Sequence, residues 1–259
     1  MHTITITIDN ITTNKYLIIY TDNCELTILK DNDILSFKKN SFIFIERGMN
    51  FSCTIKKEVS GKHPYRAIRL NKEELIILKD ILVSVHKYQL DKHIATDNYH
   101  DKLTCINGTQ EHFRIFNSID EFTNGKLKML QLAYMVSYMG IAPNIITSLI
   151  SSAAITFTDK VRSVLEKDIS KKWRLHMIAD EFNLAEVSVR KRLESEGTSF
   201  NDLLIETRMS KAMSLLLNNE LQIHQISKEV GILSSSYFIK MFKNHFGVTP
   251  KQFIIYFRT

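Results

Sequence analysis

Apolar residues follow two different periods along this chain, and the period changes about a quarter of the way along it. In the first part they alternate with polar residues or form short β-rich runs, which is the period of half-buried strands. Further on they recur every three or four positions, as in helices that bury one face. The pattern therefore predicts an α+β protein in which strands come first and helices follow.

Six strands are predicted in the N-terminal part. Thr and Ile alternate strictly in the first of them, and turn signals such as Asp22-Asn23 and Gly61 separate the later runs. The predicted strands are Thr3–Ile8, Tyr16–Tyr20, Glu25–Leu29, Phe42–Ile45, Phe51–Ile55 and Ala67–Leu70. So many short strands in about 70 residues are typical of a small antiparallel barrel or sandwich.

Helices are predicted after these strands. Asn71 is a good N-cap, Glu73 and Glu74 place acids in the first turn, and an apolar face continues to Val85. Residues 89–109 are polar, lack periodicity and are predicted to be a loop. Two further helices are predicted at Phe113–Ile119 and Lys126–Met139, and the second is apolar over a wide arc.

The last hundred residues contain one helical unit twice. Each copy has a short helix of the form apolar-x-x-x-small, a turn, and a second helix with a polar outer face, which is the helix-turn-helix pattern. The units are predicted at about 171–197 and 219–247. Leu175, Ala179, Leu184, Leu193, Gly197, Ser199 and Leu203 recur as Ile223, Ser227, Ile232, Phe242, Gly247, Thr249 and Phe253.

A continuous helix is predicted between the two units. Asn201–Asn218 has apolar residues on one face and contains neither Gly nor Pro. The capping pair Thr158-Asp159 opens the helical half, which puts the join at about residues 153–158. We therefore expect an N-terminal domain at 1–157 and a C-terminal all-α domain at 158–259.

Composition narrows the class of protein. The chain has 259 residues, of which 44% are hydrophobic and 24% charged, as in soluble globular proteins. No apolar run is long enough to span a bilayer, and the N-terminus does not read as a secretion signal. Cys24, Cys53 and Cys105 are scattered, which favours reduced thiols. We expect a cytoplasmic protein with no membrane partner.

Charge favours nucleic acid as a partner, mainly through its local distribution. The net charge of +6 is a weak signal, but Val230–Thr259 contains four basic residues and no acidic one. Such a surface is suited to meeting phosphates. The second helix of each unit would then read double-stranded DNA in the major groove.

The helical spacing separates core from DNA-facing positions in these second helices. Val189 and Leu193 in the first unit, and Phe238, Met241 and Phe242 in the second, are the predicted core residues. Arg and Lys can pair with the acceptor edge of guanine, Ser reads loosely, and Ile contacts a thymine methyl. The alternative is a basic face that meets only solvent. The DNA-binding candidates are Glu186, Val187, Arg190, Lys191, Ser235, Ser236, Ile239, Lys240 and Lys243.

The linking helix and the second unit contain a set of closely spaced motifs: Arg208, Ala212, Leu215, Leu216, Ile226-Ser227, Gly231, Ser236-Tyr237-Phe238, Phe242-Lys243 and Gly247-Val248-Thr249-Pro250. These residues resemble the signature of the AraC family of transcription regulators. The family usually has Phe where Ile232 stands and often Arg or Tyr-Arg where Phe253 stands. The first unit, with Ile178-Ala179-Asp180 and the stretch from Ser188 to Glu196, resembles the enteric virulence-gene activators of that family, the Rns, ToxT and RegA group.

The resemblance implies a cupin-like β-barrel in the N-terminal half, followed by helices, and two helix-turn-helix units joined by a long helix. It implies a sequence-specific DNA-binding transcription regulator that activates virulence or colonisation genes, with promoter DNA and RNA polymerase as partners. In family terms the helices after the barrel form a homodimer interface. The alternative is that they only pack on their own barrel.

The resemblance also implies a small anionic effector, a fatty acid or bicarbonate, and no other cofactor. Arg69, in the last barrel strand, is the first candidate for the carboxylate, with Lys15 and Asn14 on a neighbouring strand. His224, at the start of the second unit, would couple the domains. An exposed or structurally paired Arg69 and a solvated His224 are the alternatives.

The rival hypothesis is a cupin-like small-molecule-binding protein or a metal-dependent enzyme with a helical assembly domain. His86, His93 and His100 are seven residues apart, but the acids between them argue against the one helix that would align them. The sequence has no His-x-His pair, phosphate loop, Gly-x-Ser-x-Gly elbow or Cys-x-x-Cys. We therefore predict neither an enzyme nor a metal site.

Overall fold

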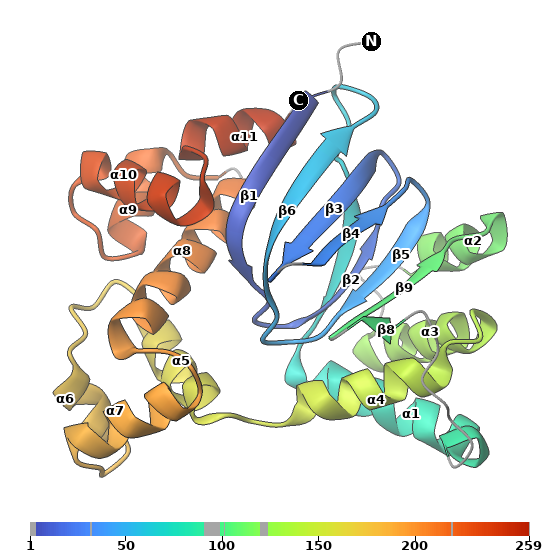
Figure 1. The fold of residues 1–259 in the computed structure, drawn as a ribbon, viewed down its shortest axis with the longest axis horizontal. Helices are drawn as coiled ribbons and strands as arrows, with labels where there is room; N and C mark the ends of the chain where they lie inside the picture. Colours follow the sequence, from blue (N-terminus) through green and yellow to red (C-terminus); the bar gives the residue numbers. More distant parts are fainter. Residues whose placement is uncertain are drawn as a thin grey trace. The chain divides into compact units, whose positions relative to one another are not determined.

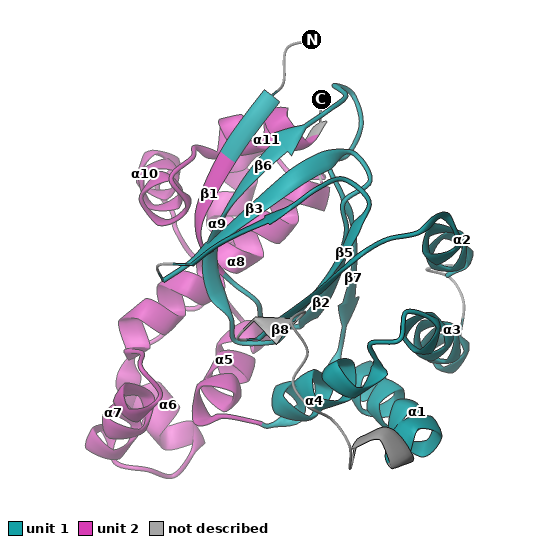
Figure 2. Cartoon of the chain, turned by 45° about the vertical axis from the view of Figure 1, so that its right-hand side comes forward, with its two compact units in different colours: residues 1–6, 12–154 teal, residues 7–11, 155–259 magenta. Residues whose placement is uncertain are grey.

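The computed structural model describes residues 4–31, 33–90, 99–100, 102–119, 124–218 and 220–258. The chain divides into two compact units (Figures 1 and 2). Unit 1 comprises Met1–Ile6 and Thr12–Ala154, and unit 2 comprises Thr7–Ile11 and Ile155–Thr259. Within the described ranges, no helix has the combined length and hydropathy needed to cross a bilayer.

The strands form two antiparallel sheets, ordered β1-β6-β3-β4 and β7-β2-β5-β9-β8 (Figure 1). The α+β fold class is confirmed, but the two sheets are not joined into one closed barrel in the described part of the chain. The strands are β1 (Ile4–Thr12), β2 (Tyr16–Tyr20), β3 (Cys24–Lys30), β4 (Asp33–Phe37), β5 (Ser41–Ile45), β6 (Asn50–Lys57), β7 (Arg66–Leu70), β8 (Tyr99–His100) and β9 (Leu103–Asn107).

All six predicted strands are confirmed, and two further strands of five residues were missed. β4 follows directly on the polar residues around Asp31 that predicted only a turn. The loop predicted at 89–109 is wrong over β9, which pairs with β5 from Ser41↔Asn107 to Ile45↔Leu103. That pairing joins segments about sixty positions apart, so the local pattern around Leu103–Asn107 contains little sign of it.

The two faces of β2 have different surroundings. Tyr16, Ile18 and Tyr20 belong to a core that includes residues of four helices. Residues on one face of a strand alternate, so Leu17 and Ile19 belong to the opposite face. The helices of unit 1 are α1 (Lys72–Leu90), α2 (Gln110–Ser118), α3 (Gly125–Tyr138) and α4 (Ala142–Ala153).

Helix α1 begins where the sequence predicts. The backbone N–H of Asn71 donates to Glu74 Oε2 at 2.8 Å, and the N–H of Glu74 donates to Asn71 Oδ1 at 2.9 Å. This reciprocal pair is a capping box. Leu78 and Leu82 are fully buried, and each such side chain contributes about 1.5–3 kcal/mol of hydrophobic stabilisation. The capped start and the apolar face together fix α1 against the sheet.

Unit 2 contains seven helices in its described part: α5 (Phe157–Lys167), α6 (Leu175–Glu181), α7 (Glu186–Ser195), α8 (Phe200–Asn218), α9 (Ile223–Glu229), α10 (Ser235–Phe246) and α11 (Pro250–Arg258). The long linking helix is confirmed as α8. The predicted cap of α5 needs a correction, because Thr156 is the N-cap and forms the capping box with Asp159. The Glu196 carboxylate accepts from the N–H groups of Phe157 and Thr158 at the same helix start.

Arg208 joins the parts of unit 2. It extends from α8 to the loop between α5 and α6, where Nη2 donates to the Lys171 carbonyl at 2.9 Å and Nε to the Ile169 carbonyl at 3.4 Å. Burial lowers the pKa of Arg208. Gly231, in the turn after α9, lies against the same loop, since a Cβ built on it would be 2.5 Å from the Ser170 carbonyl oxygen. The turn of the second helix pair is therefore packed on the loop that precedes the first.

Candidate DNA-binding surface

Helix α7 divides into a buried and an exposed face. Val189 and Leu193 are fully buried in a core that includes residues of α5, α6 and α8. Lys191 lies between them in sequence and hence, at 100° per residue, on the opposite side of the helix. The other predicted DNA-facing residues of this helix, Glu186, Val187 and Arg190, are also exposed.

Helix α10 has the same organisation. Phe238 and Phe242 are fully buried, Met241 is partly buried, and Phe246 extends the buried face by one more turn. The exposed predicted residues are Ser236, Ile239, Lys240 and Lys243. Ser234 caps the helix, because its side chain accepts from the N–H of Tyr237.

Ser235 departs from its predicted position. It is partly buried, and its hydroxyl oxygen lies 3.5 Å from that of Ser227 in α9. Its place in the first turn of α10 turns it toward the preceding helix, so it can donate within the unit. Ser235 is therefore less available to DNA than its neighbour Ser236.

Equivalent positions of the two units carry lysine at the centre of the exposed face. Lys191 lies two residues before Leu193, and Lys240 lies two residues before Phe242. Each lysine also lies two positions after the first buried residue of its helix. Lys191 and Lys240 therefore have the same orientation relative to the buried face of their helices. A long cationic side chain at that place can pair with guanine or with phosphate.

Two exposed apolar residues near α10 were missed by the sequence analysis. Leu233 is 86% exposed in the turn before the helix, and Tyr237 is 58% exposed in its first turn. The three serines Ser234–Ser236 separate them, and neither was among the predicted core or DNA-facing residues. Their sequence distance from Phe238, five positions and one position, was the signal that could have placed them outside the buried stripe.

The charge of the two exposed faces differs. Helix α7 carries Glu186 and Glu194 beside its basic residues, whereas α10 carries no acid. A hollow of about 590 Å³ beside α7 is lined by both of these acids together with Arg190 and residues of α6 and α8. Mixed charge makes that hollow a poor anion site. The acid-free face of α10 is the better match for phosphates.

The structure places three of the predicted effector residues at one end of the five-stranded sheet. Arg69 is exposed and is the Cα partner of Leu17, so it shares the sheet face that points away from the helices. Lys15 is exposed just before β2. The Asn14 side-chain oxygen is shielded from solvent and accepts no hydrogen bond within the described residues. His224 is exposed in unit 2.

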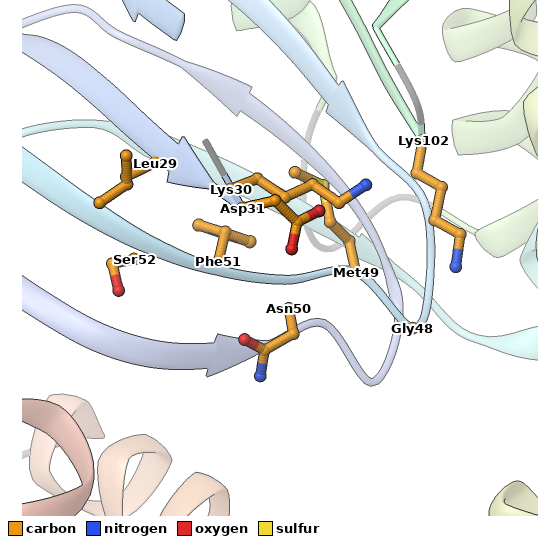
Figure 3. A pocket seen from close by; sticks show the side chains of 9 residues that line it. All are labelled: Leu29, Lys30, Asp31, Gly48, Met49, Asn50, Phe51, Ser52 and Lys102. Carbon is orange, nitrogen blue, oxygen red and sulfur yellow. The ribbon is translucent and has the colours of Figure 1, made fainter. Parts of the chain in front are cut away.

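A pocket of about 390 Å³ lies elsewhere in unit 1, between the end of β3 and the start of β6 (Figure 3). Its lining includes Lys30, Asp31, Phe51 and Lys102 and none of the predicted effector residues. Its lining residues include two lysines and one aromatic ring. The predicted effector residues therefore have no part in this pocket.

Of the three histidines spaced seven residues apart, His86 is the one whose side chain the structure describes. His86 is buried, and its Nε2 lies 2.8 Å from the Ser137 hydroxyl, so it links α1 to α3. His93 lies outside the described residues, as does the side chain of His100. Among the residues that the structure does describe, no group of His, Cys, Asp and Glu could hold a metal ion.

Comparison with known proteins gives matches over almost the whole chain. A helix-turn-helix domain model matches residues 178–254. The transcriptional activator AggR of Escherichia coli is 40% identical over 98% of this chain and 96% of its own length. The dual transcriptional regulator Rns of Escherichia coli is 41% identical over 98% and 96%. The virulence regulon activator VirF of Shigella flexneri is 33% identical over 94% and 92%.

The fold also matches a solved structure. ToxT from Vibrio cholerae superposes with a TM-score of 0.68 over 99% of this chain and 96% of its own, at 18% identity. One further ToxT structure, with a TM-score of 0.64, contains an unsaturated fatty acid. At this identity the similarity concerns the arrangement of the two units' elements alone.

Proposed function

This chain belongs to the AraC family of helix-turn-helix transcriptional regulators, and from that premise we propose that it activates virulence or colonisation genes by binding their promoters through both helix-turn-helix units. The relatives named above are transcriptional regulators, so the rival hypothesis of a cupin-like enzyme is not favoured. RNA polymerase is the protein partner that activation requires, and the cytoplasm is the compartment where both meet DNA.

One observation carries the proposal: both recognition helices present a lysine opposite their buried residues. Lys191 and Lys240 would enter successive major-groove segments on one side of the duplex, about 34 Å apart. The proposed neighbours in base reading are Arg190 on α7 and Ser236 and Ile239 on α10, with Lys243 on the adjoining phosphate. Glu186 and Val187 complete the α7 face, and Ser235 has a lesser role.

A footprint with the full chain on DNA upstream of its own gene tests the proposal. Two protected segments about ten base pairs apart are expected on one face of the helix. Salt should weaken the complex, because each phosphate contact releases counterions. Protection that ignores sequence, spread evenly over the probe, would argue against a sequence-specific regulator.

We further propose that residues 1–157 form an effector domain and residues 158–259 a DNA-binding domain. Arg69 would pair with the anionic head group of the effector, helped by Lys15 and Asn14, and His224 would relay its presence to the second domain. Asn14 would take part through its side-chain amide N–H, because an ionised carboxylate accepts hydrogen bonds and has no proton to donate to the Asn14 oxygen. A fatty acid is favoured over bicarbonate because apolar strand residues such as Leu17 flank Arg69.

Arg69→Ala is expected to abolish the response of DNA binding to decanoate, since a charge-assisted pair fixes the head group. Arg69 is exposed, so the thermal unfolding temperature should stay near that of the parent. The measurement is a gel-shift titration with and without decanoate. Lys56→Ala, an exposed lysine of β6, is the control and should respond normally. A decanoate response that survives in Arg69→Ala would remove this residue from the effector site.

A homodimer through α3 is the proposed assembly. Leu127, Leu130, Tyr134 and Tyr138 lie within an arc of about 80° on this helix and are each more than half exposed. An apolar stripe of this kind marks an interaction surface. A second copy of the chain would cover it with the same stripe, as a two-fold axis requires.

Leu130→Glu combined with Tyr134→Glu is expected to convert the dimer to monomers, because two carboxylates would be buried unpaired at the interface. Sedimentation equilibrium gives the mass directly. Val85→Glu, on an exposed apolar position of α1, is the control and should leave the mass unchanged. An unchanged dimer in the double variant would exclude α3 as the interface.

A further inference from the structure

A pocket of about 600 Å³ opens where β2 ends, at the far end of the strand from Lys15. Four separate connections form its wall. Asp22 and Asn23 come from the turn between β2 and β3, Lys39 from the turn between β4 and β5, Lys62 from the loop between β6 and β7, and Thr109 from the start of α2. A volume of this size suits a small organic molecule.

The pocket is cationic. Lys39, Lys62 and Arg66 line it with Asp22 as the one acid in the lining. Lys39 is partly neutralised by Glu58, whose carboxylate lies 2.5 Å from it outside the lining. The surplus of positive charge selects an anion over a neutral or cationic ligand.

Arg66 provides the central group of the pocket. Its guanidinium carbon lies 5.4 Å from the ring centroids of Tyr20 and Phe113 and 5.0 Å from that of Phe116. One terminal nitrogen donates to the side-chain oxygen of Asn117. Nε and the other terminal nitrogen donate to no acceptor among the described residues, although Nε is 3.5 Å from an Asp22 oxygen.

Unsatisfied guanidinium donors are costly when shielded from water. A planar fork of this type is suited to two parallel hydrogen bonds with a carboxylate or phosphate. The ring of Phe113, which is partly exposed, adds an apolar surface to the lining on which a planar group can stack.

We propose that this pocket binds a small organic anion whose carboxylate or phosphate lies on Arg66, Lys62 and Lys39 and whose planar body stacks on Phe113. The inference does not rest on the proposed effector site. Arg66 belongs to the face of β7 that packs against the helices, whereas Arg69 belongs to the other face. A ligand here would contact α2 directly, and α2 packs on α3.

The test uses the full chain and isothermal titration with salicylate, adenosine monophosphate and inorganic phosphate as probes. Saturable binding of salicylate or of the nucleotide in the millimolar range is expected, with inorganic phosphate weaker because it has no ring to stack. If salicylate binds more tightly than the nucleotide, the natural ligand is a carboxylate. If the nucleotide binds more tightly, the natural ligand is a phosphate ester. If neither salicylate nor adenosine monophosphate binds, the proposal is wrong.

Variants locate the binding. Lys62→Ala removes an exposed cation from the lining and is expected to weaken the bound probe about fivefold. Lys56→Ala removes a lysine outside the pocket, so it should leave probe affinity unchanged. Equal losses in Lys62→Ala and Lys56→Ala would contradict the assignment.

Discussion

Lys240→Ala is expected to weaken binding of promoter DNA by about tenfold, and Lys191→Ala by a similar factor. Each lysine lies opposite the buried residues of its recognition helix, where a side chain extends farthest into the groove. Removing it deletes either a guanine pair or a phosphate pair. Gel-shift titrations at several salt concentrations separate these, because only a lost phosphate contact reduces the salt slope by about one unit.

Lys160→Ala is the matched control for these variants. It removes the same charge from an exposed position of α5, which is not one of the two recognition helices. Its affinity should stay within about twofold of the parent, since it lowers only the net charge. Normal promoter binding by both Lys191→Ala and Lys240→Ala would show that the exposed faces of α7 and α10 do not contact DNA.

Gly231→Ala is expected to destabilise the helical half by about 3 kcal/mol or more. Gly231 has a φ of +73°, a left-handed backbone that costs a non-glycine residue about 1–2 kcal/mol. An added Cβ would also be 2.5 Å from the Ser170 carbonyl oxygen and 2.9 Å from an Arg208 nitrogen. Both atoms belong to the junction that holds the loop and the turn together, so neither can move freely.

Gly197→Ala separates the two causes. Gly197 has a φ of +78°, but a Cβ there would meet nothing within 4 Å. This variant should lose only the backbone term, about 1–2 kcal/mol. Thermal unfolding of the full chain is the measurement, with a drop of roughly 4–8 °C for each kcal/mol in a unit of this size. Equal drops in the two variants would mean that the junction yields to the added methyl group.

Local pattern predicts most of the fold. The sequence signals for these elements lie in or next to the elements themselves. Examples are the alternation in β1, the caps at Asn71 and Ser234, and the uninterrupted apolar spacing of α8. β9 is different, because the pairing with β5 that stabilises it lies far away in sequence. The open arrangement of two sheets also depends on which strands meet at their edges, and no single strand's pattern specifies that.

The exposed faces of the recognition helices can also be predicted from local sequence. Buried Phe238 and Phe242 fix the rotation of α10, and that rotation alone places Lys240 outside. Ser235 shows the limit, because its partner Ser227 comes from another helix and turns a small polar side chain inward. The pocket around Arg66 has no sequence signature at all. Its walls come from four connections that only the folded sheet brings together.

The contact of Gly231 with the loop at Ser170 has an evolutionary consequence. Because this contact and Arg208 fix one helix pair against the other, a promoter can drift in either half-site and still be recognised, each change costing about one base contact. Inserting or deleting a base pair between the half-sites rotates one of them by about 34° relative to the other. Both helix pairs could then bind only if the contacts of Gly231 and Arg208 with the loop were distorted. Selection on target promoters should therefore preserve the spacing between half-sites more strictly than the base sequence within each half-site.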